Sequence, residues 1–243
     1  MTLPVFLVAS LPAGEEFVLD GPEGRHAATV KRLRVGEELV LSDGSGAQVR
    51  CAVTAVEKDA LALRVVERWV EPEPTPRVVL AQALVKGDRG ELAVELATEA
   101  GVDGVVPWRA ARCITKWEDG PRGAKALGRW RSTVREAAKQ ARRSRVPVVD
   151  EPVSTTQLSH RVSSSALTLV LHESATERLA DVALPESGDV LLVVGPEGGI
   201  TPEELDALRS SGARIVRLGP TVLRASTAAA VALGAIGVRT ARW

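Results

Sequence analysis

Two apolar strands near the C-terminus each end in a Gly-Pro turn, and each turn opens a helix. The first segment reads LLVVGPEGGITPEEL from Leu191, and the second reads RIVRLGPTVLRASTAA from Arg214. Glycine lets a ligand approach the backbone closely, and open α/β sheets bind ligands where the carboxyl ends of strands meet. The two turns therefore predict one binding site that is built largely of backbone.

The rest of the C-terminal part alternates between strand-like and helix-like segments. Strands are expected at 77–85, 104–107, 146–149, 166–171, 189–194 and 213–218, and helices at 89–100, 123–145, 202–211 and 224–239. Within the helix at 89–100, Leu92, Leu96 and Ala100 fall on one side. This alternation predicts an α/β domain in which helices cover both faces of a parallel sheet.

Residues 71–76 divide the chain by composition, because prolines alternate there with polar residues and form a stiff linker. Before this linker, strand-like spacing occurs at 5–9, 38–41, 48–56 and 60–66, with a turn at 43–46 and a helical segment at 24–33. We therefore predict a small β-barrel domain over 1–70 and an α/β domain over 77–243.

The turn at 195–199 leads into a sharply defined helix start. Thr201 suits the N-cap, Pro202 suits the first helical position, and Glu204 completes a capping box. The turn lacks the lysine of a P-loop and the spacing of a dinucleotide fingerprint, and the acidic Glu197 disfavours a phosphate nearby. The remaining alternatives are a ligand other than phosphate and a tight turn without a ligand.

The helix that follows the second turn is rich in alanine and nearly featureless. Such a helix packs closely and is typical of a core or a subunit interface. Arg224 is the one charge near its start. Because a cation there opposes the helix dipole, we expect Arg224 to have a specific partner. A surface pair with Glu197 or Glu173 is the alternative.

Positive charge is concentrated at residues 122–145, where nine Lys or Arg accompany one acid. The net charge is zero by count, but nucleic-acid binding depends on where the charge lies. Arg131, Arg135, Lys139 and Arg142 recur at helical spacing, and like charges on one face repel unless a polyanion lies opposite. We interpret this face as an RNA-binding surface; a merely solvated face is the alternative.

The helical segment at 24–33 adds positive charge to the barrel, where contact with phosphate and a solvated face are equal alternatives. Taken together, the candidate RNA contacts are Arg25, Lys31, Arg32, Arg34, Arg131, Arg135, Lys139, Gln140 and Arg142.

Several function classes are disfavoured. Cys51 and Cys113 follow no metal-binding spacing and are expected to be buried or idle thiols in a reducing cytoplasm. The three histidines are far apart in sequence, so no metal site is expected. Apolar runs are strand-sized, which disfavours a membrane span, and the N-terminus lacks a basic leader. We expect a cytoplasmic protein.

The segments LVVGPEGGITPEEL and RLGPTVLRASTAA also carry a family resemblance. As a pair they resemble, with high specificity, the RsmE family of SPOUT methyltransferases. The resemblance covers the whole chain: residues 26–34 and 41–44 are similar to the family's H-x-x-x-V-L-R and D-G segments. Residues 86–102 are similar to its K-x-x-R-x-E and A-T-E-L-G-V run, and residues 136–147 to its E-A-x-x-Q-S-x-R…P segment.

The chain departs from the family pattern at a few positions. Glu95-Leu96 stands where Gln-Lys is common, Ser226 where Glu is common, and Ala141 where Ser is usual. We therefore assign no carboxylate role at Ser226 and no hydroxyl contact at Ala141.

The resemblance implies a fold and an activity. The fold would be a knotted, mostly parallel sheet whose last helix threads a loop, preceded by a PUA-like barrel, in a homodimer with cofactor sites beside the interface. The activity would be methylation of N3 of a uridine in small-subunit (16S) ribosomal RNA, with S-adenosylmethionine as the methyl donor.

The resemblance also implies the site residues. Three loops would hold the cofactor through Leu171, His172, Gly195, Pro196, Glu197, Gly198, Gly199, Leu218, Gly219, Leu223, Arg224 and Thr227. For catalysis, Arg224 would stabilise negative charge on the uracil oxygens, and Glu197 would orient the base or the cofactor. The residues identify no general base.

Two other functions remain open from the sequence. One is a related SPOUT enzyme that methylates a different base or a ribose hydroxyl, because fold alone does not fix the substrate. The other is a non-catalytic RNA-binding protein that keeps the barrel and the basic helix.

Overall fold

The computed structural model describes residues 3–243, which form two compact units. The first unit contains the residues up to Glu73 together with Ala138–Val146, and the second contains Pro74–Ala137 and Pro147–Trp243. The break after Glu73 lies within the predicted linker. The inclusion of Ala138–Val146 in the first unit is a feature that the local sequence did not indicate. In residues 3–243, no helix is long and apolar enough to cross a membrane.

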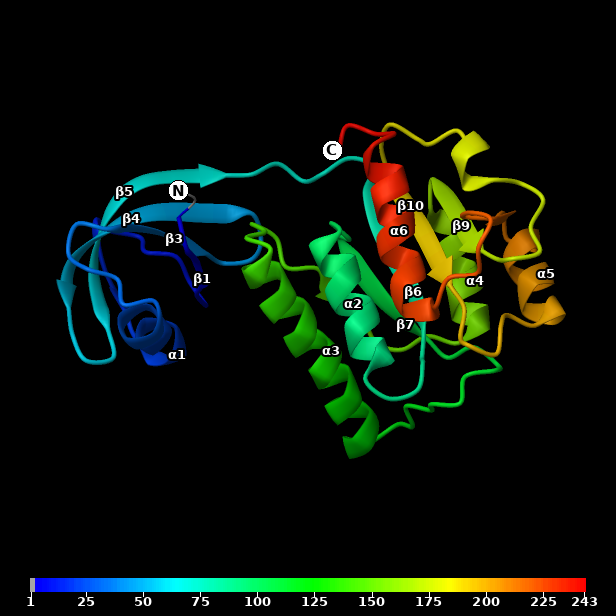
Figure 1. Cartoon of the computed structure of the whole chain (residues 1–243), viewed down its shortest axis with the longest axis horizontal. Coiled ribbons are helices and arrows are strands. Elements are labelled where there is room, and N and C mark those ends of the chain that lie inside the picture. The colour runs from blue at the N-terminus through cyan, green and yellow to red at the C-terminus, as the bar shows by residue number, and fades with distance from the viewer. Residues whose placement is uncertain (1–2) are drawn as a thin grey trace. The chain divides into compact units, whose positions relative to one another are not determined.

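The first unit is built on a five-stranded sheet with the strand order β1-β3-β4-β5-β2 (Figure 1). β1 pairs in parallel with β3, and the other neighbours are antiparallel. The strands are β1 (Val5–Leu7), β2 (Glu16–Leu19), β3 (Glu38–Ser42), β4 (Ala47–Val56) and β5 (Leu61–Val70). β2 was not predicted, because an edge strand of four residues has too little alternation to be recognised.

The sheet of the first unit curls around one hydrophobic core. Phe6 from β1 and Leu19 from β2 lie in the same buried cluster, although these strands form opposite edges of the sheet. Cys51 also lies in this core, and its burial raises the pKa of the thiol to about 11. Burial likewise raises the pKa of Cys113, in the second unit, to about 11. Both cysteines are buried and free, as expected.

A helical segment follows β2, as predicted. α1 (Gly21–Arg25) continues directly into a π-helical turn, η1 (His26–Val30). The basic helix α3 spans Pro121–Gln140 and ends five residues before the predicted end at 145. Arg142 lies in the turn beyond it, with a φ of 56°. The prediction that Arg142 shares a helix face with Arg131, Arg135 and Lys139 is therefore wrong.

The second unit contains the predicted parallel sheet, with six strands in the order β11-β9-β10-β6-β7-β8. Every neighbouring pair is parallel. The strands are β6 (Arg77–Ala83), β7 (Gly104–Trp108), β8 (Val148–Val149), β9 (Leu167–Leu171), β10 (Asp189–Val194) and β11 (Arg214–Val216).

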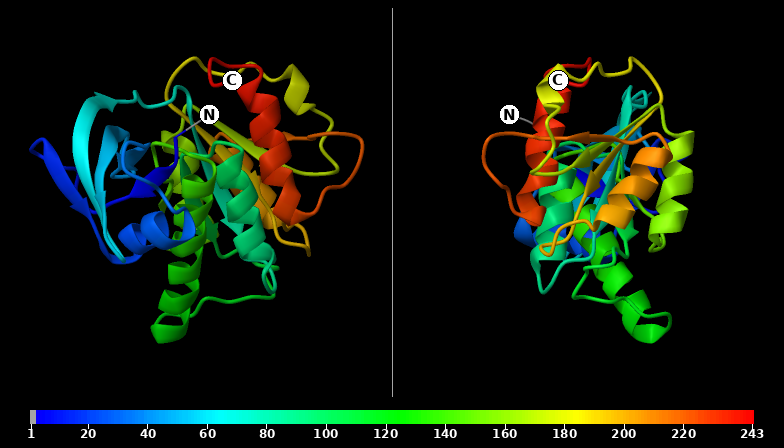
Figure 2. Two further views of the ribbon diagram at one scale, coloured as in Figure 1. Left: turned by 60° about the vertical axis from the view of Figure 1, so that its left-hand side comes forward. Right: turned by 90° about the vertical axis from the view of Figure 1, so that its right-hand side faces the viewer.

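Helices cover both faces of this sheet (Figure 2). α2 (Arg89–Glu99) and α6 (Ala225–Gly237) lie side by side on one face, and α4 (Thr155–Ser164) and α5 (Pro202–Ser210) lie together on the other. α4 was not predicted, although its start carries a signal. The Ser154 hydroxyl accepts a bond from the Gln157 amide, and the Gln157 side-chain oxygen accepts one from the Ser154 amide.

Small side chains let α2 and α6 approach closely. The buried residues of α2 include Ala93 and Ala97, and those of α6 include Ala229 and Ala232. The side of α2 that carries Leu92 faces outward instead, and Leu92 is 41% exposed. Leu92 is thus left exposed on α2, whereas Val94 of the same helix is buried.

The C-terminal helix α6 lies beneath the connection between β9 and β10. Arg239, just beyond α6, donates hydrogen bonds to the carbonyls of Leu179 and Val182 at 2.8 and 2.6 Å. Leu179 lies in a short 3₁₀ turn, η2 (Leu179–Asp181), within that connection. These bonds tie the end of the chain to the connection between β9 and β10.

A buried ion pair fixes the chain's C-terminal end. Arg242 lies 2.7 Å from the carboxylate of Asp103, and both side chains are only 8% exposed. The same guanidinium donates to the carbonyls of Pro76 and Gly101. Asp103 also accepts a bond from the Val78 amide at 2.8 Å. The terminal residues are thus tied to the start of β6 and to the loop before β7.

We predict that Arg242→Met lowers the free energy of unfolding by about 3–5 kcal/mol, because it leaves the buried Asp103 carboxylate without this cation. Arg209→Met is the matched control, since Arg209 forms an exposed pair with Asp206 on α5, and we expect a loss below about 0.5 kcal/mol there. Guanidinium denaturation of both variants measures the difference. Equal losses in the two variants would contradict the role given to Arg242.

Candidate functional site

A cavity of about 850 Å³ lies at the carboxyl ends of β9, β10 and β11. Three segments line it: 171–174 after β9, 194–200 after β10, and 217–226 after β11. These contain all of the predicted cofactor residues except Thr227, which does not line the cavity. The Thr227 hydroxyl bonds to the Arg224 carbonyl at 3.2 Å and belongs to the start of α6. The size is typical of a site for a small organic ligand.

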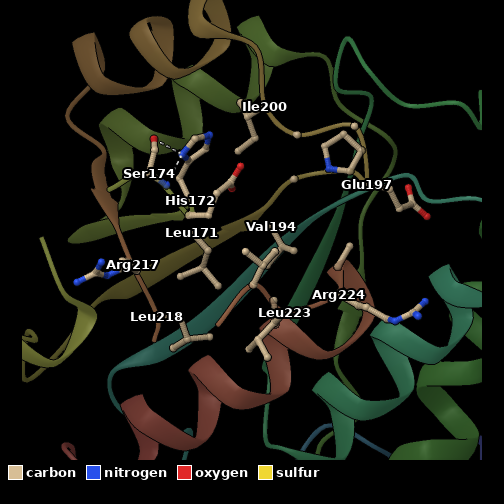
Figure 3. A pocket seen from close by; sticks show the side chains of 18 of the residues that line it. Leu171, His172, Ser174, Val194, Glu197, Ile200, Arg217, Leu218, Leu223 and Arg224 are labelled. Atoms are coloured by element: carbon tan, nitrogen blue, oxygen red, sulfur yellow. Dashed lines mark hydrogen bonds between the residues drawn. The ribbon is translucent and has the colours of Figure 1, made fainter. Parts of the chain in front are cut away.

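Aliphatic side chains form the floor of the cavity. Figure 3 shows Leu171, Val194, Leu218 and Leu223 grouped in the middle of the cavity, with Ile200 apart from them, nearer to His172. Each comes from a strand end or from the loop that follows it. The floor therefore offers an apolar contact surface for a flat or aliphatic part of a ligand.

The loop 195–199 is held in one conformation by backbone geometry. Gly199 has a φ of 76°, and its amide donates to the Pro196 carbonyl at 2.9 Å. Gly195 lies so close to Ile200 that an added Cβ would be 2.6 Å from its Cγ1. Glycine is required at both positions, at Gly199 for its φ and at Gly195 for space.

The predicted capping box at the start of α5 is confirmed. The Thr201 side chain accepts a bond from the Glu204 amide, and the Glu204 carboxylate accepts one from the Thr201 amide, both at 3.2 Å. This fixes the point at which the loop 195–199 turns into the helix.

Glu204 has a second role, which its sequence position did not indicate. Its carboxylate is buried and also accepts bonds from the Ala111 amide at 2.8 Å and the Thr155 hydroxyl at 2.9 Å. The neighbouring Arg112 donates to the Gly198 carbonyl at 3.1 Å. Glu204 thus joins α5 to a fourth segment, which follows β7 and presents Arg112 to the cavity. Arg112 is not among the site residues predicted from the sequence.

Several backbone amides in the cavity are left for a ligand. Within residues 3–243, the amides of Leu218, Gly219 and Leu223 donate to no acceptor. A ligand with an edge of hydrogen-bond acceptors would satisfy them. His172 contributes a polar ring to the same cavity, and its Nδ1 lies 2.8 Å from the Ser174 hydroxyl.

The two predicted catalytic residues lie at one side of the cavity. Figure 3 shows the side chains of Arg224 and Glu197 both extending away from the aliphatic floor. Both are exposed, and in the described part of the chain no carboxylate lies within ion-pair distance of Arg224. The alternative of a surface pair with Glu197 or Glu173 is therefore wrong. Glu197 accepts a long bond of 3.4 Å from the Lys86 amide.

The Arg224 backbone is fixed although its guanidinium is not. Arg224 is the N-cap residue of α6, and its carbonyl accepts bonds from the amides of Thr227 and Ala228, each at 3.0 Å. The helix start therefore sets where this side chain leaves the backbone, and the guanidinium remains available to a ligand.

The predicted RNA contacts fall in both units. In the first unit, Lys31, Arg32, Arg34, Gln140 and Arg142 are exposed, and Arg25 lies 3.8 Å from Asp59. Lys139 is different, because its ammonium lies 2.7 Å from the Glu23 carboxylate and its side chain is only 17% exposed. In the second unit, Arg131 pairs with Glu151 at 3.0 Å, and Arg135 is exposed.

Comparison with known proteins gives the family. Residues 71–237 match the family model described as an RNA methyltransferase domain, and residues 19–66 match the model of an RNA methyltransferase PUA domain. A Mycobacterium bovis protein named ribosomal RNA small subunit methyltransferase E is 55% identical over all of this chain and 94% of its own length. The chain belongs to the ribosomal RNA small subunit methyltransferase E family.

More distant members of this family agree in sequence and in fold. The Bacillus subtilis member is 32% identical over 92% of this chain and 90% of its own length. A crystal structure of the Neisseria gonorrhoeae member bound to S-adenosylmethionine has a TM-score of 0.87 and 28% identity, and the match covers 98% of each chain. A putative methyltransferase from Legionella pneumophila, also bound to S-adenosylmethionine, has a TM-score of 0.85 and 30% identity, covering 99% of this chain and 98% of its own.

The predicted fold class is thereby confirmed. The chain has the parallel sheet of the SPOUT methyltransferases and a PUA-like N-terminal unit. The sequence motifs at the two Gly-Pro turns were sufficient to identify the family, because their glycines and caps build the loops that define the cavity.

We predict that Gly195→Ala lowers the free energy of unfolding by about 1–3 kcal/mol, because the new methyl overlaps Ile200 in a packed loop. Gly219→Ala is the control within the same cavity, since its added Cβ would have nothing within 4 Å, and we expect a change within about 0.5 kcal/mol. Urea denaturation of both variants distinguishes them. If the free energy of unfolding of Gly195→Ala equals that of the wild type, the loop accommodates the methyl group and the argument from space is wrong.

Proposed function

We propose that this protein transfers a methyl group from S-adenosylmethionine to N3 of a specific uridine in small-subunit (16S) ribosomal RNA. The observation that carries the proposal is the cavity formed by the three strand-end loops, in a chain that closely matches a family member bound to S-adenosylmethionine. The first unit, which matches a PUA domain, supports RNA as the substrate.

The residues of the cavity suit the proposed methyl donor. Its aliphatic floor suits the flat adenine ring, and the unpaired amides of Leu218, Gly219 and Leu223 suit the ring's acceptor nitrogens. The glycines at 195, 198 and 199 allow close approach of the ligand to the backbone. When bound, S-adenosylmethionine supplies an electrophilic methyl group on its sulfonium.

The protein must also stabilise the substrate base. Uracil N3 carries a proton, and its loss leaves negative charge that is shared with the two carbonyl oxygens of the base. The Arg224 guanidinium has no internal partner and lines the cavity, so we assign it the stabilisation of that charge. Glu197, on the same side of the cavity, is assigned the orientation of the base or the cofactor.

The target base must leave its stack to reach this cavity, because N3 lies on the edge that pairs with another base. The exposed arginines and lysines of both units would hold the RNA backbone during this step. We propose that the substrate is the assembled small subunit. A ribosomal substrate in turn supports a cytoplasmic location.

We further propose that the protein acts as a homodimer through α2 and α6. These helices lie side by side, and they expose Leu92 by 41% and Val231 by 49%. Val238 and Trp243, beyond α6, are 69% and 66% exposed. A run of exposed apolar side chains over neighbouring helices is typical of a subunit interface.

Arg224→Ala tests the proposed chemistry. We expect methyl transfer to small-subunit RNA to fall by about 10²–10³-fold, because charge stabilisation at the base is lost. Binding of S-adenosylmethionine, measured by calorimetry, should persist. Arg161→Ala on α4 is the control, since Arg161 pairs with Asp150 outside the cavity, and it should retain activity.

Mass mapping of the methylated RNA separates the alternatives. A product methylated at N3 of uridine supports the proposal, and methylation at another base or at ribose supports a different SPOUT specificity. A wild-type protein that binds RNA but no S-adenosylmethionine would be a non-catalytic RNA-binding protein. Full activity of Arg224→Ala would remove Arg224 from the mechanism.

For the dimer, we predict that Val231→Glu yields a monomer in sedimentation velocity experiments, because it places a charge in an apolar interface. Val66→Glu is the control: this exposed residue lies on β5 of the first unit, and the variant should remain dimeric. A monomeric wild-type protein, or a dimeric Val231→Glu protein, would overturn the proposed interface.

A further inference from the structure

Two helical segments are followed, in the first unit, by arginines with left-handed backbone conformation. Arg32 follows η1 with a φ of 54°, and Arg142 follows α3 with a φ of 56°. Among residues 3–243 these are the only residues other than glycine with a positive φ. L-residues disfavour this conformation because Cβ approaches the following carbonyl oxygen. Each arginine therefore occupies a position at a conformational cost.

The end of α3 has the hydrogen bonds of a Schellman motif. The Arg143 amide donates to the Ala138 carbonyl at 2.9 Å, and the Arg142 amide donates to the Lys139 carbonyl at 3.1 Å. The end of η1 closes with a turn that is wider by one residue, in which the Leu33 amide donates to the Ala27 carbonyl at 3.1 Å. In a Schellman motif, the residue just before the one whose amide bonds back to the helix has a left-handed backbone. That residue is usually glycine.

The second unit shows that this protein uses glycine when only the turn is needed. α2 ends with Gly101 at a φ of 96°, followed by a 3.0 Å bond from Val102 to Ala97. α5 ends with Gly212 at a φ of 107°, followed by a 3.0 Å bond from Ala213 to Leu208. The left-handed residue after these two helices of the second unit is thus glycine, whereas after η1 and α3 it is arginine.

Neither arginine gains an internal partner for its strained backbone. Both side chains are exposed, and within residues 3–243 neither makes a hydrogen bond or an ion pair. Other cations of the same unit do have acceptors: Lys139 pairs with Glu23, and Arg145 donates to the Glu71 carbonyl. The contacts of the folded chain therefore do not explain why arginine stands at positions 32 and 142.

We propose that Arg32 and Arg142 are phosphate-contacting residues through which the first unit holds the backbone of its RNA substrate. A guanidinium matches the geometry of phosphate oxygens, and a fixed turn at a helix end presents it outward from a defined point. An exposed cation that is left without an internal acceptor is available to a polyanion. The proposal rests on the proposed function, and it identifies which cations of the first unit serve it.

The rival explanation is the helix dipole, since a cation near a helix C-terminus is itself favourable. The two explanations predict opposite changes in stability on replacement by glycine. If the dipole outweighs the backbone strain, the variant is less stable than the wild type. If the arginine is kept for RNA, the variant is more stable and binds RNA less well.

The experiment therefore measures stability and RNA affinity on Arg32→Gly, Arg142→Gly and the double variant of the full-length protein. We expect each single change to raise the melting temperature by about 2–4 °C, the shift typical of relieving one strained residue in a chain of this size. Filter binding to purified small subunits at about 0.1 M salt should show an affinity lower by about five- to eightfold for each lost phosphate contact.

The salt dependence provides a second readout on the same samples. The slope of log affinity against log salt should decrease by about 1 for each arginine, and the two decreases should add in the double variant. Arg32→Lys and Arg142→Lys keep the charge and should retain most of the affinity. Lys58→Gly is the matched control, because Lys58 is an exposed cation of the same unit with an ordinary φ.

Three results would overturn the proposal. One is a lower melting temperature in both glycine variants, and another is unchanged RNA affinity. The third is an equal loss of affinity in Lys58→Gly, which would indicate general surface charge. Failure of the proposed function can be distinguished from failure of the arginine proposal. In the first case, the wild-type protein itself would transfer no methyl group, independently of the results for the arginine variants.

Discussion

The site depends on the parallel register of three strands. β9 lies between β10 and β11, and Leu171 at its end pairs with Val194 on one side and Val216 on the other. Parallel strands that end at the same level release their loops into the same space. This register places three loops from distant parts of the chain around one cavity, and no loop could form that cavity alone.

The loops are held in place by contacts within the protein itself. The capping box at Thr201 fixes one end of the loop 195–199, and Glu204 joins the same helix start to the loop that carries Arg112. Because the Glu204 carboxylate is buried and accepts several hydrogen bonds, its removal would leave unsatisfied donors in three segments. The protein thus presents preformed amides to a ligand and orders little chain when the ligand binds.

Charge is used differently in the two units. In the first unit, some cations are committed to internal pairs, as Lys139 is to Glu23, whereas Arg32 and Arg142 are exposed at strained turns. In the second unit, Arg224 lines the cavity without an internal carboxylate partner, and Arg242 is buried against Asp103. Sequence alone gives these arginines and lysines equal weight as cations. Only the tertiary structure shows which cations have an internal acceptor and stabilise the fold, and which have none and remain free to contact a ligand.

The amino-acid sequence by itself determined the alternation of strands and helices, the start of α5 at Thr201, and the two glycine-rich turns that identified the family. These features are local, since they depend on residues within a few positions of one another. Tertiary structure decided the rest. The edge strand β2 exists because it pairs with β5, and α3 ends at Gln140 instead of 145 because the chain turns back at Arg142. Glu204 meets an amide 93 positions away, at Ala111. Such contacts have no local pattern, because folding alone brings the partners together.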